Sequence, residues 1–165
     1  MRDNLNGIQP SKGSTYCVLG NLYTFRAIGK DTSEAYALFE LLVQPHYSLP
    51  LHAHSLEDEA FYILDGEVEF QIEEQTFVAT SGTFLHCSKG QLHRFTNIGA
   101  MPAKMLYWVI PAGLEDFFAE VGQLREHLSS ELSALSPTDM EKFLAIAPDY
   151  GLEIIPSPSD FCNQP

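Results

Sequence analysis

Residues 52–66 read HAHSLEDEAFYILDG, which places two histidines one residue apart, then a glutamate, a strand-like run and a closing glycine. Residues two apart on a β-strand point to the same face, so His52 and His54 should point together. Glu59 opens the following strand-like run and shares its expected face with Phe61. This spacing allows a carboxylate and two imidazoles to converge on one point.

A third histidine, His93, lies downstream in the stretch GQLHRFTN, on the same expected face as Phe95. Together with the first three residues it offers three imidazole nitrogens and one carboxylate oxygen. Such a set suits a divalent transition metal and leaves positions for water or substrate. The alternative is three surface histidines and a solvated glutamate. We favour the metal because each buried polar group without a partner costs about 1–3 kcal/mol, and a metal removes that cost.

The chain has 165 residues, of which 45% are hydrophobic and 19% charged, values typical of one folded domain. Its formal net charge of -13 argues against nucleic acid and anionic membranes as partners, and fits a protein that acts on a small molecule. The first residues lack the apolar core of a signal peptide. No stretch reaches the roughly 18–20 apolar residues needed to span a bilayer.

The three cysteines are Cys17, Cys87 and Cys162. Their odd number and wide spacing fit reduced thiols in the cytoplasm better than a disulfide framework or a zinc site. Only Cys87 lies near the other candidate residues, and we do not expect it to be catalytic.

The sequence divides into three regions. We expect a flexible polar arm over residues 1–15, strands over 16–111, and helices with a tail over 112–165 that pack on the strands or on a dimer partner. The expected strand segments are residues 35–45, 59–66, 67–80, 83–88, 92–99 and 103–111. Residues 114–121 place their apolar side chains on one helical stripe, and Ser136 is the expected N-cap of a second helix.

Many short strands followed by a small helical segment predict an all-β fold. Periodicity does not choose among a sandwich, a jelly roll and a barrel. It also leaves open which face of the segment 103–111 points inward. One alternative places Met105, Tyr107 and Val109 inside, and the other places Leu106, Trp108 and Ile110 there.

The two histidine-containing stretches resemble the two motifs of the cupin family. The first motif, G(X)5HXH(X)3–4E(X)6G, is matched from its histidines to Gly66, and the second, G(X)5PXG(X)2H(X)3N, is matched from Gly82. Fifteen residues separate the two motifs, as in compact single-domain cupins. The resemblance covers about residues 35–111.

Two positions depart from these motifs, and neither supplies a metal ligand in the family. His46 stands at a glycine position, which puts the usual left-handed turn in doubt there. Ser88 stands at a proline position, but Gly90 should preserve that turn. Asn97 closes the second motif, and we expect it to stabilise a turn rather than to bind metal.

The resemblance implies a cupin jelly roll, also called a double-stranded β-helix, with a short C-terminal helical appendix. It further implies one divalent transition metal per chain, which is iron, manganese, nickel, cobalt, copper or zinc. The implied metal ligands are His52, His54, Glu59 and His93. Many cupins pair into dimers, so we expect a homodimer with residues 16–30 as the candidate interface strand.

The segments WVIPAGLEDFFAEVG (108–122) and APDYGLEIIPSP (147–158) look similar to small bacterial cupins described as quercetinase-like. This likeness implies a metal-dependent dioxygenase that acts on a small aromatic or enolisable substrate, with Glu59 as both metal ligand and catalytic base. The alternatives are a binding or sensing cupin without turnover, and a metal-dependent isomerase or lyase. The candidate pocket residues are His46, Phe61, Ile63, Gln91, Phe95 and Tyr107.

Overall fold

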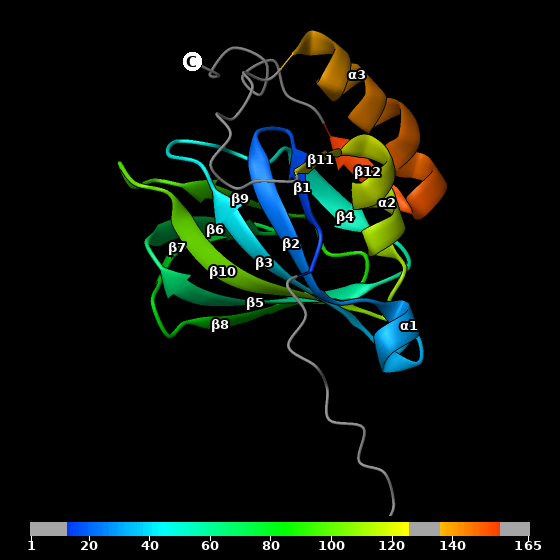
Figure 1. Cartoon of the computed structure of the whole chain (residues 1–165). Helices are drawn as coiled ribbons and strands as arrows, with labels where there is room; N and C mark the ends of the chain where they lie inside the picture. Colours follow the sequence, from blue (N-terminus) through cyan, green and yellow to red (C-terminus); the bar gives the residue numbers. More distant parts are fainter. Residues whose placement is uncertain (1–12, 126–135, 156–165) are drawn as a thin grey trace, which may run out of the picture.

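Two antiparallel sheets face each other in the computed structural model, which describes residues 13–125 and 136–155 (Figure 1). The seven-stranded sheet runs in the order β11 (Gln123–Arg125), β1 (Thr15–Val18), β2 (Asn21–Ala27), β3 (Ala37–Val43), β10 (Ala103–Ile110), β5 (Asp58–Asp65) and β8 (Phe84–Cys87). The five-stranded sheet runs in the order β12 (Leu152–Ile155), β4 (Leu51–His54), β9 (His93–Asn97), β6 (Glu67–Ile72) and β7 (Gln75–Thr80). A single turn of helix, α1 (Gly29–Thr32), connects β2 to β3. The expected all-β jelly roll is confirmed.

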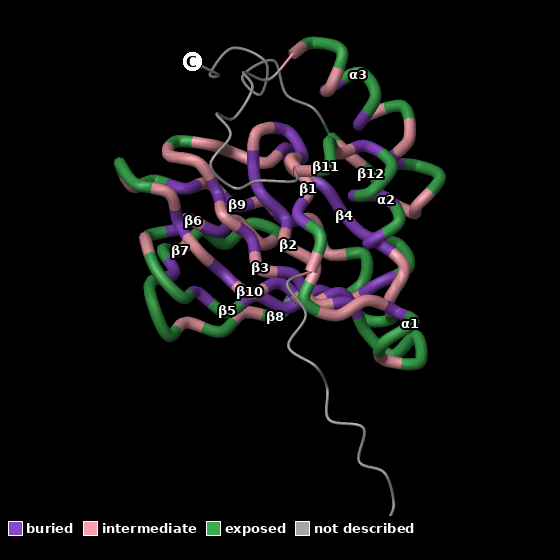
Figure 2. Tube along the Cα trace, in the orientation of Figure 1, coloured by how far each residue is buried: buried purple, intermediate pink, exposed green. Residues whose placement is uncertain are grey.

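Alternating burial explains why these segments form strands with one face in the core. Every second residue of β3, from Ala37 to Val43, is buried, and the residues between them are half-buried. In β6, Val68 and Phe70 are buried while Glu67 is exposed. The period of two follows from the pleat of a strand. The buried faces of both sheets meet in one hydrophobic core (Figure 2).

The face of β10 that points inward is now decided. Met105, Tyr107 and Val109 are buried, whereas the alternate residues, beginning with Leu106, are half-buried or exposed. Because β10 lies between β3 and β5 near the middle of its sheet, its inner face meets core residues on both sides. Tyr107 therefore lies opposite Phe61 of β5 inside the barrel.

Both departures from the cupin motifs keep their turns. His46 has a φ of 60°, the left-handed conformation that glycine favours. The expectation that histidine puts the left-handed turn in doubt at this position is therefore wrong. Histidine is one of the few side chains enriched in that conformation. In the second motif, the Gln91 N–H donates to the Ser88 carbonyl at 3.0 Å, and Gly90 has a φ of 82°. As expected, Gly90 maintains this turn without the proline.

The C-terminal region contributes strands as well as helices. Helices α2 (Leu114–Val121) and α3 (Pro137–Ile146) contact each other through Phe117 and Phe143, whose ring centroids lie 5.1 Å apart. After α2, β11 pairs with β1, and after the 3-10 helix η1 (Ala147–Tyr150), β12 pairs with β4. This region therefore extends both sheets, and β11 was not expected from the sequence.

The apolar stripe of α2 packs into the core of its own chain. The ring of Phe118 lies 4.4 Å from that of Tyr23 and 5.3 Å from that of Phe39. Helix α3 begins as the sequence predicts, since the Ser136 hydroxyl accepts the Asp139 N–H at 3.2 Å. Figure 1 shows both helices on the same side of the barrel as β4 and β12.

The N-terminal strands pair within the chain. Of the expected flexible arm, residues 1–12 lie outside the described residues, and β1 already begins at Thr15. Strand β1 pairs with β2 on one side and with β11 on the other, so the strands within residues 16–30 have partners in their own chain. None of the described helices is long and apolar enough to cross a membrane.

Asn97 ties three backbone segments together at the end of β9. It is fully buried, and its amide nitrogen donates to the carbonyls of Val43 at 3.0 Å and Met101 at 2.9 Å. Its side-chain oxygen accepts the Gly99 N–H at 2.9 Å. The expectation that Asn97 stabilises a turn is confirmed.

We expect Asn97→Ala to lower the free energy of unfolding by about 3 kcal/mol, because buried carbonyls would lose their donor. Urea denaturation followed by circular dichroism measures this change. Gln75→Ala, at an exposed position on β7, is the control and should shift stability by less than about 0.5 kcal/mol. Equal midpoints for the two variants would contradict this role of Asn97.

Candidate metal centre

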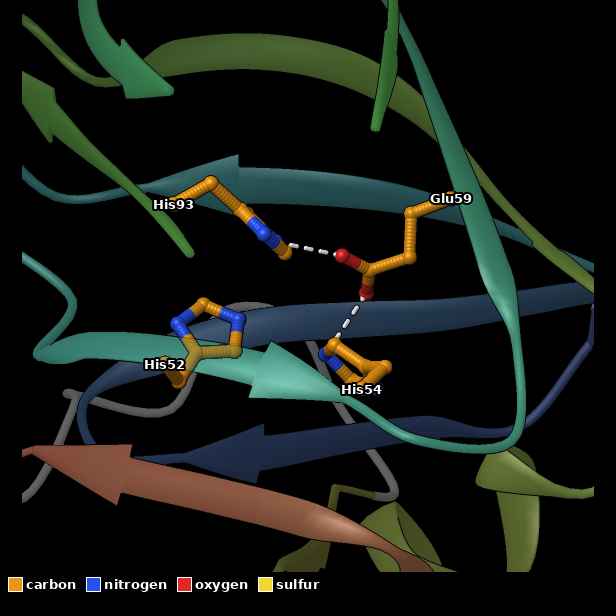
Figure 3. Close-up of side chains that lie close together, drawn as sticks. All are labelled: His52, His54, Glu59 and His93. Atoms are coloured by element: carbon orange, nitrogen blue, oxygen red, sulfur yellow. Dashed lines mark ion pairs between the residues drawn. The ribbon is translucent and has the colours of Figure 1, made fainter. Parts of the chain in front are cut away.

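The candidate metal ligands come from both sheets and meet between them. His52 and His54 lie on β4 and His93 on β9, in the five-stranded sheet, whereas Glu59 lies on β5 of the seven-stranded sheet. One ligand atom from each residue lies within 4.8 Å of all the others, and all four side chains are buried. Figure 3 shows the three imidazoles and the carboxylate pointing into the same space. The structure thus brings together all four residues predicted to bind metal.

Backbone carbonyls orient two of the imidazoles. The Nδ1 of His52 lies 2.9 Å from the Pro50 carbonyl, and the Nδ1 of His93 lies 2.9 Å from the Gln91 carbonyl. A carbonyl only accepts, so each Nδ1 carries the proton and each Nε2 is the atom available to a metal. The cross-strand pairing of His52 with His93 places these two rings side by side.

Glu59 contacts three side chains at once. Its Oε1 lies 2.9 Å from His54 Nε2, and its Oε2 lies 2.5 Å from His93 Nε2. The Tyr107 hydroxyl also donates to Oε1. Burial and the charge of Glu59 raise the pKa of Tyr107 well above its usual value, so this hydroxyl remains a donor.

The charges of the cluster shift its protonation. Burial would raise the pKa of Glu59, but the charges of His54 and His93 hold it well below its usual value. Burial would lower the pKa of His54, yet the carboxylates of Glu59 and Glu57 raise it to about 9. Burial and the charges of His93 and His54 lower the pKa of His52 to about 3. Glu59 is therefore ionised and His52 is neutral, which are the forms that bind metals, whereas His54 is protonated and would release a proton on binding a metal.

Two ligand atoms at the centre of the cluster form an ion pair but no hydrogen bond of normal geometry. The atoms are Glu59 Oε2 and His93 Nε2, which are fully buried and face each other. Buried polar atoms without a hydrogen bond are costly, and a cation held by the cluster would satisfy both. Three imidazole nitrogens and a carboxylate oxygen suit a divalent transition metal. The residues present therefore fit one metal ion, and several metals share this preference.

A cavity with about 450 Å³ of empty space, part of it open to solvent, leads to the cluster. Of the predicted pocket residues, Phe61, Phe95 and Tyr107 line it, together with His52, His54 and Glu59. The rest of the lining is apolar or aromatic, and much of it lies outside the two motifs. These other lining residues are Tyr23, Leu41, Leu49, Pro50, Phe118, Phe143, Leu152 and Ile154.

The other predicted pocket residues lie elsewhere. His46 is exposed on its turn, and Ile63 is fully buried in the core without lining the cavity. The Gln91 side chain does not line the cavity, and its Oε1 accepts the Ser88 N–H at 2.8 Å. The backbone carbonyl of Gln91, and not its side chain, contributes to the site, because it accepts from His93 Nδ1 and orients that ring.

Cys87 borders the cluster but stays a thiol. It pairs across the strands with Glu59 and is only 1% exposed. Burial and the Glu59 charge raise the pKa of Cys87 to about 12, so little nucleophilic thiolate forms near neutral pH. This agrees with the expectation that Cys87 is not catalytic.

Sequence reasoning overlooked a second buried carboxylate. Glu57 is 5% exposed, and its Oε2 lies 3.6 Å from His54 Nδ1. The signal was available, because Glu57 lies two residues before Glu59 and should share its face. The cavity residues of α2, α3 and β12 had no comparable signal, since they reach the cavity only through tertiary packing.

Sequence comparisons agree with this geometry. A family model described as "Cupin domain" matches residues 39–110. Over 140 residues, the chain is 19% identical to quercetin 2,3-dioxygenase of Bacillus subtilis (strain 168). The matched part is 85% of this chain but only 41% of that enzyme, so the chain spans less than half the length of this curated relative. The chain therefore carries a cupin domain over residues 39–110 and resembles the quercetinase-like group.

Solved structures support the fold. An RmlC-like cupin from Shewanella frigidimarina NCIMB 400 superposes with a TM-score of 0.56 at 14% identity, covering 67% of this chain and 93% of that one. A predicted oxalate decarboxylase from Thermotoga maritima superposes with a TM-score of 0.53 at 22% identity, covering 67% and 99%. At such identities the likeness shows the cupin fold and not a shared reaction.

We expect the purified protein to bind close to one transition metal per chain, measured by elemental mass spectrometry after reconstitution. The combined substitution His52→Ala/His93→Ala should abolish binding, because it removes two of the three imidazoles. His86→Ala is the matched control, since His86 is exposed on β8 outside the cluster, and it should bind like the wild type. Wild-type protein that takes up no metal would refute the site.

Proposed function

We propose that this chain, which carries a cupin domain over residues 39–110, is a metal-dependent dioxygenase of small aromatic or enolisable substrates. The observation that carries the proposal is the cavity itself, which is aromatic and apolar along its walls and ends on the buried ligand cluster. The likeness to quercetin 2,3-dioxygenase supports the same reaction class. A bound divalent transition metal would supply a Lewis acid for the substrate oxygen and a site for oxygen chemistry.

The cavity walls favour a substrate with little charge. Phe61 and Tyr107 stack at 4.9 Å with an interplanar angle of 8°, and Phe95 lies 6.1 Å from Phe61. Flat apolar surfaces of this kind suit an aromatic ring. Among the residues that the structure describes, no lysine or arginine lines the cavity, so a phosphosugar would find no counter-charge.

Glu59 is the proposed proton acceptor. Its ionised carboxylate lies at the inner end of the cavity, where a substrate hydroxyl would approach the metal ligands. Tyr107 donates to one carboxylate oxygen and thereby holds Glu59 in place. Removing the proton from a phenol or enol would make the substrate more electron-rich and readier to react with O2.

Oxygen uptake tests this function. With metal-reconstituted protein and a flavonol such as quercetin, we expect an oxygen electrode to record substrate-dependent O2 consumption. Glu59→Gln, compared at equal metal content, should lower kcat by about 100-fold or more because the base is lost. Glu67→Gln, at an exposed site on β6, should retain the wild-type rate.

The two alternatives give different results in the same assay. A metal-dependent isomerase or lyase would convert its substrate without consuming O2. A sensing or binding cupin would show ligand-dependent quenching of protein fluorescence with no turnover. No O2 uptake from flavonols or other enolisable aromatics by metal-loaded protein would refute the dioxygenase proposal.

We also propose a homodimer that acts in the cytoplasm, where free thiols such as Cys17 and Cys87 remain reduced. Because the strands within residues 16–30 are already paired, we place the interface on the outer face of β5 and β8. Tyr62 and Phe84 pair there and are 37% and 61% exposed. Exposed apolar patches of this kind often mark contacts between chains.

Light scattering after gel filtration tests the dimer. We expect a mass near twice the 18.4 kDa of one chain, and a shift toward the monomer for Phe84→Glu. Val78→Glu, at a 51% exposed position on β7 of the other sheet, should leave the mass unchanged. A monomeric wild type at high concentration would refute the dimer.

A further inference from the structure

Glu57 is a buried carboxylate that the ligand set does not use. It directly precedes β5, and its side chain points at the far side of the His54 ring from Glu59. Its Oε2 and the Nδ1 of His54 lie 3.6 Å apart, beyond hydrogen-bond distance, and neither atom has a hydrogen-bond partner. A buried carboxylate oxygen without a hydrogen bond is costly, so its presence requires a physical explanation.

The protons on the three imidazoles supply that reason. An imidazole that binds a metal through Nε2 carries its proton on Nδ1 and must donate it. His52 and His93 donate to the carbonyls of Pro50 and Gln91. In the described part of the chain, the group that faces Nδ1 of His54 is the Glu57 carboxylate.

We propose that Glu57 is a positioning residue for the metal site, whose carboxylate accepts the Nδ1 proton of His54 when Nε2 binds the metal. The inference rests on the proposed metal-dependent function. His54 Nε2 now pairs with Glu59 Oε1 at 2.9 Å. A shift of about 0.5 Å in the His54 ring or the Glu57 side chain would complete the hydrogen bond on the other side.

This arrangement makes His54 different from the other two imidazoles. A charged acceptor on Nδ1 makes the ring a stronger electron donor to a metal than a neutral carbonyl does. Glu57 and Glu59 together would also offset the two positive charges of a divalent ion in a buried site. Glu57 should therefore strengthen metal binding and alter the electronic environment of the ion without touching it.

The test is a titration of the metal-free protein with Co²⁺ against a competing chelator, together with the visible spectrum of the bound ion. We expect Glu57→Gln to weaken Co²⁺ binding about 10-fold, because it keeps an acceptor but loses the charge. Glu57→Met, which removes the acceptor as well, should weaken binding about 100-fold. Both variants should shift the visible bands of Co²⁺, a change that a purely structural role would not produce.

Asp58→Asn is the matched control. Asp58 adjoins Glu57 in sequence, but its Oδ1 accepts the Lys89 N–H at 2.8 Å, a bond that asparagine retains. The Asp58→Asn substitution removes one nearby negative charge without changing the contact between Glu57 and His54. The Co²⁺ affinity and the visible spectrum of the bound ion should therefore stay near wild-type values. Glu57→Gln is nearly isosteric, so it decides the question even if Glu57→Met fails to fold.

Three results would overturn the inference. Unchanged Co²⁺ affinity and spectrum in Glu57→Gln would show that His54 needs no carboxylate. An equal loss of Co²⁺ affinity in Asp58→Asn would show that the effect comes from any nearby negative charge and not from the contact of Glu57 with His54. A wild type that does not bind Co²⁺ would refute the metal site itself, whereas normal wild-type binding with an unaffected Glu57→Gln would refute only the role of Glu57.

Discussion

The contact of one carboxylate from the seven-stranded sheet with imidazoles from the five-stranded sheet is the constraint around which this barrel is organised. Glu59 reaches across the interior to His54 and His93, and all three side chains are buried. Ionisable groups are costly to bury unless they pair or bind a cation. The two sheets must therefore hold a fixed spacing here, while the pairing of β5 with β10 and of β4 with β9 fixes the register within each sheet.

The chemistry of the cavity depends on segments that lie far from the cluster in sequence. Phe118 of α2, Phe143 of α3 and Leu152 of β12 line its walls, although all three lie outside the matched cupin domain. The domain thus supplies the ligands and most of the walls, while the C-terminal region supplies a further part of the surface that a substrate would meet. This division explains how one fold carries many reactions, because the walls can change while the ligands persist.

Much of the fold could be predicted from the sequence, because strand periodicity and turns depend on residues close together in the chain. The alternation in β6, the N-cap at Ser136 and the turn at Gly90 appeared where they were predicted. The left-handed turn at His46 went against the expectation, since histidine tolerates this conformation better than most side chains. Strand β11 was missed because its three residues form a strand only through pairing with β1.

By itself, the sequence determined an all-β fold through strand parity, and its resemblance to the cupin motifs added the jelly roll and the four candidate ligands. Only the tertiary structure decided which face of β10 points inward, which of the predicted pocket residues reach the cavity, and that Glu57 lies buried behind His54. The physical reason is that parity along one strand says which side chains point together, but not what lies opposite them. That information exists only once the sheets, the helices and β12 have packed against one another.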